Sequence, residues 1–372
     1  MRGNRQEWKQ SRPGKKSLSS GNEAPQKIHY TQIDILKGLA IISVVLMHTY
    51  SEKLLTAYGA PFYLFQAVPV FLLLAAFNNA QSLSLLKKRT LAQCYDIAII
   101  LRRMKRLMVS YTVIWIIQLV LVFWVLASMI DLKVQNPNHF FYSGIDTVIF
   151  NFLCGANGPG NYFIPMIVQF IFLVPLFYYL ALRSPNQMLV IAFVLDLVME
   201  YLSVLSGLPS WLYAVMVTRY VFMAGLGVWL VFQERVLTPW IVIGAVASAA
   251  YIAAVSYFQF QFWIFSLDPA FYHAFAFLWT LLVVVLGFQY LPSIPSGPVV
   301  RVVTELGKAS WHIFLVQMTW FFFLGFAYPP LDQSIGAVVI LALMYLVPCL
   351  SIGYVFYRLQ NYIMKPGKNL AR

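Results

Sequence analysis

The sequence predicts an all-α polytopic membrane protein with about ten transmembrane helices in one bundle. Three observations predict this class. The 372 residues are 60% hydrophobic and only 10% charged, whereas a soluble domain carries about a quarter charged residues. The mean hydropathy is +0.73. The apolar runs cluster near the ~20 residues that a spanning helix needs. Short connections between the runs favour a single membrane domain, which we place at residues 30–358.

Apolar runs along the chain give the expected order of spans. They cover roughly residues 33–50, 61–79, 107–129, 161–182, 188–205, 211–232, 238–257, 270–290, 310–328 and 335–357. Residues 1–29 are polar and lack a periodic apolar pattern, so we expect a disordered basic cytosolic tail. Residues 359–372 are expected to form a short cytosolic tail.

The basic residues predict the orientation of the chain. If the N-terminus is cytosolic, 23 of the 26 Lys and Arg residues fall on the inner side of this topology. Such an asymmetry predicts that both termini are cytosolic in a multi-pass protein of the cell (inner) membrane. The same distribution argues against nucleic acid as the reason for the net charge of +13. The cysteines Cys94, Cys154 and Cys349 lack metal-type spacing, so neither a metal site nor a disulfide framework is indicated.

The first apolar run, Tyr30 to Tyr50, carries ionisable residues that a lipid-facing helix avoids. At ~100° per residue, Lys37 and His48 lie on nearly the same helix face and are roughly 16 Å apart along it. Asp34 joins this stripe through its i,i+3 spacing to Lys37. Such residues should face protein or water. The alternative is that Lys37 snorkels to the cytosolic headgroups while His48 sits at the outer interface.

The segment IDILKGLAIISVVLMH, with a basic residue, ten residues and then His, resembles the first transmembrane helix of the acyltransferase-3 family of integral membrane acyltransferases. The family usually has Arg where this chain has Lys37. The resemblance implies that His48 is catalytic. A neutral imidazole with an ordinary pKa near ~6.5 suits a general base that takes the proton of an acceptor hydroxyl. Transient transfer of the acyl group to His48 itself is the other role left open.

The basic cluster Arg102, Arg103, Lys105 and Arg106 precedes the third run. It resembles the family's basic motif after the second helix, which implies a site for the phosphates of an acyl-CoA donor. Arg binds phosphate in bidentate fashion. The alternative is a role in topology and in attraction to anionic lipid. We expect Lys87 to Arg89 to serve this second purpose.

Two later segments also resemble the family. In GPGNYFIPM, Tyr162 and Phe163 occupy the place of a common Trp-Phe pair, and Tyr162 is a candidate cavity residue or simply an interface aromatic. In TELGKASWHIFLVQ, Ser310 is expected to cap the ninth spanning helix. The family often has a histidine where this chain has Gln317, which can hydrogen-bond but cannot act as a base.

Three charged residues fall inside the fifth and sixth runs. Asp196 and Glu200 share one helix face, and Arg219 lies within the next run. Charges at membrane depth face one another or a wet cavity. They are therefore either a buried lock between helices or the wall of a polar cavity. A proton relay is the third alternative.

Taken together, the resemblance implies an O-acyltransferase. By this resemblance it would move an acyl group, acetyl in the first instance, from acyl-CoA to a hydroxyl of a cell-envelope glycan or a lipid-linked sugar. Acyl-CoA is a co-substrate, and no permanently bound cofactor or metal is expected. The rival interpretation is a transporter or flippase that uses Asp196, Glu200 and Arg219 as its site. A structural partner in glycan assembly is the third. The sequence does not indicate an oligomeric state.

Overall fold

The computed structural model describes residues 30–128, 145–233, 237–260, 262, 272–327 and 335–364. The predicted tail at residues 1–29 and most of the tail at 359–372 lie outside these residues. So does the first half of the long loop that follows the third span. The described part is helical throughout and contains no strand, which confirms the all-α prediction.

The described residues form α-helices and short 3₁₀ helices. In chain order they are α2 (Thr31–Thr49), α3 (Glu52–Ala57), η1 (Ala60–Phe62), α4 (Ala67–Leu85), α5 (Leu91–Cys94), α6 (Ile97–Ser128), α7 (Ile145–Leu153), α8 (Phe163–Ala181), α9 (Pro185–Leu205), α10 (Ser210–Val215), η2 (Val217–Tyr220), α11 (Val221–Phe232), α12 (Pro239–Phe258), η5 (Ala274–Ala276), α13 (Phe277–Tyr290), α14 (Pro298–Ala327) and α15 (Ile335–Ile363). The η elements are 3₁₀ helices.

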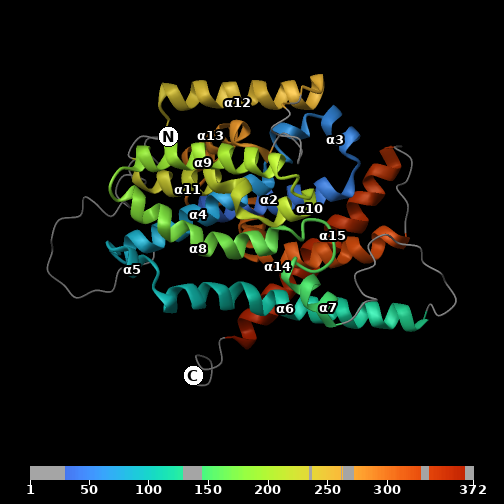
Figure 1. The fold of residues 1–372 in the computed structure, drawn as a ribbon. Helices are drawn as coiled ribbons and strands as arrows, with labels where there is room; N and C mark the ends of the chain where they lie inside the picture. Colours follow the sequence, from blue (N-terminus) through green and yellow to red (C-terminus); the bar gives the residue numbers. More distant parts are fainter. Residues whose placement is uncertain are drawn as a thin grey trace.

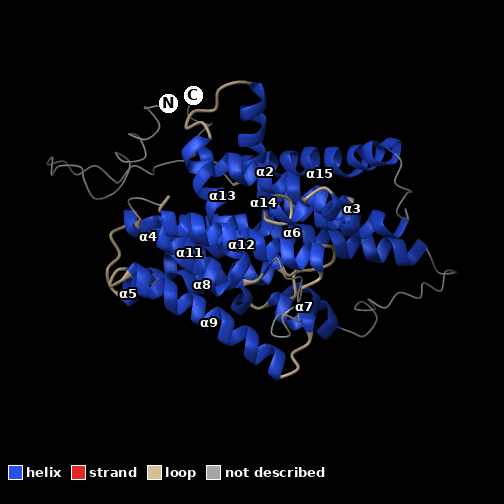
Figure 2. Ribbon diagram, turned by 90° about the horizontal axis from the view of Figure 1, so that it is seen from above, coloured by secondary structure: helices blue, strands red, loops and turns tan. Residues whose placement is uncertain are grey.

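The long helices run side by side across the molecule, with α5 at one end and α3 and α7 at the other (Figures 1 and 2). Within the described residues, seven helical segments are long and apolar enough to cross a membrane, and two shorter apolar helices accompany them. The protein is therefore a polytopic membrane protein. The count of ten spans and the cytosolic location of both termini remain predictions.

α2 is packed inside this bundle, and its most extensive neighbour is α14. The two backbones approach closely at Gly38 and Gly307. A Cβ on Gly38 would collide with the carbonyl of Val303, and one on Gly307 would collide with the carbonyl of Asp34. Small residues allow such close contact between membrane helices. The same packing completely buries Ile41 of α2.

Two helices begin earlier than the sequence predicted. α6 begins at Ile97, so the basic cluster at 102–106 lies on its first turns and not in a loop. α14 begins at Pro298, a residue favoured at the first helical position. Ser310 therefore lies in the middle of α14, and its predicted role as a helix cap is wrong. Charged residues in these first turns lower the local hydropathy and hide the true helix start.

The sixth apolar run is broken, although the sequence predicted one continuous span. Met216 has an extended backbone between α10 and η2. Gln169 of α8 bridges the break, because its Nε2 donates to the carbonyl of Val215 (2.7 Å) and its Oε1 accepts from the N–H of Val217 (3.0 Å). Backbone groups freed inside a membrane need such partners. The break places Arg219 in η2.

The contact between α2 and α14 leads to a stability prediction. In Gly307→Ala the new Cβ would press on the backbone of Asp34, and overpacking of this kind costs about 1–3 kcal/mol. We expect a lower midpoint of thermal unfolding, measured in detergent by fluorescence-detected size exclusion. Gly336→Ala is the matched control, because nothing lies within 4 Å of its Cβ position. Equal midpoints for the two variants would contradict the close contact.

Candidate active site

His48 lies in the last turn of α2, at the α3 end of the bundle. Its half-buried ring meets the ring of Phe321 edge to face, with 6.0 Å between centroids. The imidazole makes no hydrogen bond to any described residue, and neither of its nitrogens is among the fully buried polar atoms that lack a partner. Both nitrogens are therefore without a hydrogen-bond partner in the described part of the chain, as a group that acts on a reactant requires.

A tight turn at residues 155–161 forms the wall opposite His48. A Cβ on Gly160 would lie 3.8 Å from His48 Nε2, which shows how near the turn comes. Gly155, Gly158 and Gly160 all have positive φ, from 82° to 114°. A side chain on Gly158 would also strike the backbone of Met318 in α14. Glycine is required here for both backbone conformation and close approach.

Gln118 of α6 fixes this turn in place. Its Nε2 donates to the carbonyl of Asn157 (3.1 Å) and to Thr319 Oγ1 (2.9 Å), while its Oε1 accepts from the N–H of Asn157 (3.1 Å). Gln118 is 1% exposed. Since a buried amide needs partners, these bonds couple the turn to both α6 and α14. The sequence analysis did not identify Gln118.

Gln317 supports the same turn from α14. Its Nε2 donates to the carbonyl of Pro159 (3.1 Å), and its Oε1 is buried without a hydrogen-bond partner among the described residues. Phe314 and Phe321 lie one turn before and after it, so they share its helix face. Phe314 borders Gly160, and Phe321 meets His48. Gln317, a predicted cavity residue, thus helps to position the wall beside His48.

A cleft of about 490 Å³ opens beside this turn. Its walls come from α7, from the turn itself and from the end of α14, and Phe321 belongs both to this cleft and to the surroundings of His48. The cleft therefore comes within one side chain of the imidazole.

The predicted donor cluster lies toward the opposite, α5 end of the bundle. Arg102, Lys105 and Arg106 are exposed, whereas Arg103 turns inward. Arg103 Nη2 donates to the carbonyl of Asn79 on α4 (3.2 Å), and its Nη1 is buried without a hydrogen-bond partner among the described residues. Of the four basic residues in the cluster, Arg103 therefore has a buried donor, Nη1, without an acceptor in the described chain.

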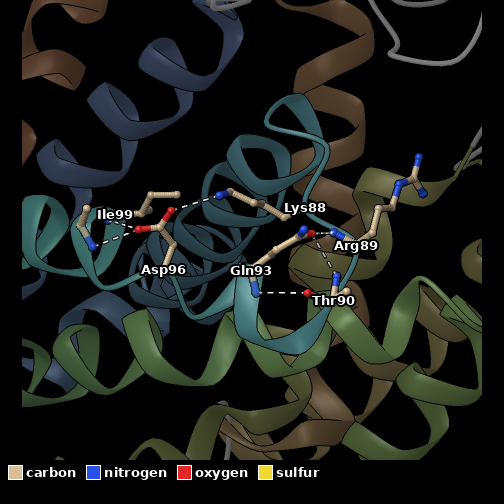
Figure 3. Close-up of polar contacts among 7 residues, drawn as sticks. Lys88, Arg89, Thr90, Gln93, Asp96 and Ile99 are labelled. Carbon is tan, nitrogen blue, oxygen red and sulfur yellow. Dashed lines mark hydrogen bonds and ion pairs between the residues drawn. The ribbon is translucent and has the colours of Figure 1, made fainter.

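The neighbouring basic residues 87–89 have structural contacts. Lys88 Nζ pairs with Asp96 Oδ2 at 3.0 Å, and Asp96 Oδ1 accepts from the N–H of Ala98 (3.0 Å) at the start of α6. Gln93 Oε1 accepts from the N–H groups of Arg89 and Thr90 (Figure 3). These contacts shape the turn between α4 and α6, as expected for a segment without a donor-binding role.

At the far end of α2 from His48, Asp34 is buried and Lys37 is half-buried. The carbonyl of Asp34 faces Gly307. One turn of helix therefore carries both residues into the packing between α2 and α14. Neither approaches His48 along the helix, so they do not orient its ring.

Asp196, Glu200 and Arg219 come together in a buried cluster with exposures of 1%, 2% and 3%. Asp196 Oδ2 accepts from the N–H of Phe222 (2.8 Å), so the carboxylate lies at the start of α11. An anion is stabilised at a helix N-terminus by the helix dipole. Glu200 Oε1 accepts from Tyr213 (3.1 Å) and pairs with His273 Nδ1.

Aromatic rings enclose the guanidinium of Arg219. Four tyrosine rings have their centroids 5.0–5.9 Å from the Cζ atom of Arg219. They belong to Tyr162, Tyr213, Tyr220 and Tyr272. Cation–π contact stabilises a desolvated guanidinium. Tyr272 also donates to Met47 Sδ (3.8 Å), next to His48. The cluster thus lies between the broken span and the end of α2 that carries His48.

His312 has a role that the sequence did not indicate. Its Nε2 lies 2.9 Å from Gln360 Oε1 and 3.3 Å from Ser110 Oγ, so it joins α6, α14 and α15. Among the described residues, no group of three His, Cys, Asp or Glu side chains is placed to hold a metal ion.

Comparison with known proteins identifies the family of this chain. A family model described as an acyltransferase domain matches residues 30–358, which is most of the chain. No curated protein and no solved structure gives a significant match. The match begins just before α2 and ends within α15, so it includes His48, the turn at 155–161 and Arg103. The chain therefore belongs to the acyltransferase-3 family of membrane acyltransferases.

Proposed function

We propose that this protein is an O-acyltransferase that moves an acyl group, acetyl in the first instance, from acyl-CoA to a sugar hydroxyl, with His48 as the general base. The observation that carries the proposal is the His48 ring, which has no hydrogen-bond partner among the described residues and lies beside the cleft. Membership of an acyltransferase family supplies the class of reaction.

The reaction requires one proton to move twice. Neutral His48 takes the proton of the acceptor hydroxyl while the hydroxyl oxygen attacks the thioester carbonyl. The tetrahedral intermediate then collapses, the carbon–sulfur bond breaks, and the imidazolium returns the proton to the departing thiolate. The turn at Gly160 limits the room beside Nε2 and so favours one orientation of the reactants.

Arg103 is the residue that best supports the binding of the donor. Phosphate oxygens of CoA would accept from its buried Nη1, which lacks a protein acceptor in the described chain. The exposed Arg102, Lys105 and Arg106 add attraction for a polyanion at the same end. Because His48 lies at the other end, the long pantetheine arm has to carry the acyl group through the bundle.

The acceptor approaches from the α3 end. If the Lys- and Arg-rich α5 end is cytosolic, as the positive-inside rule predicts, His48 lies toward the outer face of the cell (inner) membrane. An envelope glycan or a lipid-linked sugar is available there. This orientation lets the donor and the acceptor come from opposite sides of the membrane.

The transporter alternative has one observation in its favour, the break in the sixth run at Met216, close to Arg219. Discontinuous helices are common at transporter sites. Here, however, Asp196 accepts from the backbone of α11, Glu200 pairs with His273, and tyrosine rings enclose Arg219. These contacts already involve the charged groups that a transported substrate would need.

Substitution of His48 tests the catalytic assignment. We expect His48→Ala to lower transfer of label from acetyl-CoA by about 10²–10⁴-fold, because the general base is lost. The label is measured in the envelope glycan fraction and normalised to folded protein. His312→Ala is the control, since the hydrogen bonds of His312 go to Ser110 and Gln360 and not to the turn. Full transfer by His48→Ala would remove His48 from catalysis. Label found on His48 itself would favour the acyl-carrier role.

Arg103 and Arg102 form a matched pair for the donor site. We expect Arg103→Gln to raise the KM for acyl-CoA by about tenfold or more, the effect of one lost charge-assisted hydrogen bond. Arg102→Gln removes the same charge from an exposed position and should change the KM far less. The two KM values are measured at low and at physiological salt. If both substitutions raise the KM equally at low salt and neither does at physiological salt, both residues only attract the donor by their charge.

A further inference from the structure

The cleft beside the turn has the lining of a carbohydrate site. Its apolar walls include the rings of Phe150, Phe321 and Phe322, and its polar walls include the amides of Asn151, Asn157 and Asn161. Aromatic rings pack against the apolar faces of a sugar ring, and amides donate to and accept from its hydroxyls. Its volume of about 490 Å³ is typical of small-molecule sites.

Two side-chain amides of the cleft each have one atom that makes no hydrogen bond to the described chain and could bond a ligand. Asn157 Oδ1 accepts from Asn151 Nδ2 (3.0 Å), but Asn157 Nδ2 is buried without a partner among the described residues. Asn161 Nδ2 donates to the carbonyl of Ala156 (3.1 Å), whereas its Oδ1 makes no hydrogen bond to the described chain. One donor and one acceptor therefore stay open on the same turn.

The remaining amide atoms hold the wall itself. Trp115 Nε1 donates to Asn151 Oδ1 (3.2 Å), and Gln118 makes hydrogen bonds to both the N–H and the carbonyl of Asn157. The cleft is thus preformed by α6, α7 and α14. A preformed site lowers the cost of ordering that binding would otherwise include.

The position of the cleft relates it to the reaction. Phe321 contributes to its wall and also contacts the His48 ring. Pro159 and Asn161 line the cleft, and Gly160 between them faces His48 Nε2. A sugar in the cleft needs only to extend past Phe321 for a hydroxyl to reach the imidazole.

We propose that this cleft binds the acceptor, with a sugar residue packed on Phe321 and Phe322 and hydrogen-bonded to Asn157 and Asn161. This inference rests on the proposed function and adds the place and the chemical class of the acceptor.

Cys154 provides a reporter for the test. It lines the cleft and is half-buried, whereas the other cysteines, Cys94 and Cys349, are only 1% and 0% exposed. A maleimide should therefore react at Cys154 and fill part of the cleft. The extent of labelling at each cysteine is measured by mass spectrometry, and the fold is checked by the midpoint of thermal unfolding.

Membranes that contain the protein are treated with N-ethylmaleimide or a bulkier fluorescein maleimide and then supplied with labelled acetyl-CoA. We expect transfer to the endogenous glycan to fall at least tenfold, more with the bulkier reagent, while acetyl-CoA binding is unchanged. In Cys154→Ser, transfer should be the same with and without either reagent, whatever its starting level. Full transfer after complete labelling of Cys154, or an unreactive Cys154, would overturn the proposal.

A matched pair gives an independent measurement. Phe322→Ala should raise the amount of added envelope glycan needed for half-maximal transfer by about tenfold and leave the KM for acetyl-CoA unchanged. Phe323→Ala, at the next position on α14 and outside the cleft lining, should change neither value. Equal effects of the two variants would overturn the acceptor site. Absence of transfer in untreated, unsubstituted protein would instead contradict the proposed function itself.

Discussion

The close backbone contact between α2 and α14 fixes the position of His48 and of the residues around it. Gly38 and Gly307 let the two helices touch, so α2 is held by protein on the side that carries Asp34. Phe314, Gln317 and Phe321 lie on one face of α14 and so reach the end of α2 that carries His48. His48, its facing turn and the cleft all depend on this one helix pair. A lipid-facing α2 would expose its ionisable residues to hydrocarbon at high cost.

The buried charges of the fifth and sixth runs add a second constraint. The sixth run does not continue as one helix through Met216. Gln169 and Asp196 make hydrogen bonds to backbone groups beside the break, and tyrosine rings enclose Arg219. Removing one partner of such a cluster leaves a buried charge uncompensated, which typically costs about 3–5 kcal/mol. Tyr272 connects this cluster to Met47, beside His48. The cluster thus supports the end of the bundle that carries His48.

Much of the fold was readable from the sequence, because apolar runs near the length of a membrane helix are a strong signal. The all-α membrane class followed from this pattern, whereas the family and the role expected of His48 came from the resemblance of the segment IDILKGLAIISVVLMH. Helix starts were less readable. Charged first turns concealed the beginnings of α6 and α14, so Ser310 was mistaken for a cap and the basic cluster for a loop.

The supporting residues of the site had no sequence signal. Gln118 is a single amide in an apolar run, and its function depends on the backbone of Asn157, 39 residues away. Likewise, four basic residues in one cluster look equivalent in sequence, and only packing against Asn79 turns Arg103 inward. Tertiary contacts of this kind cannot be derived from periodicity. The family resemblance pointed to His48, whereas the structure supplied the wall, the cleft and the separation of the two ends.

That separation is the central claim, and sidedness of transfer tests it most directly. Sealed membrane vesicles of both orientations are supplied with external acetyl-CoA, which does not cross the bilayer. Vesicles with the α5 end outward should label their glycan at once, and those of the opposite orientation only after permeabilisation. Equal labelling of both sealed preparations would contradict a donor site and a catalytic histidine at opposite ends of the bundle.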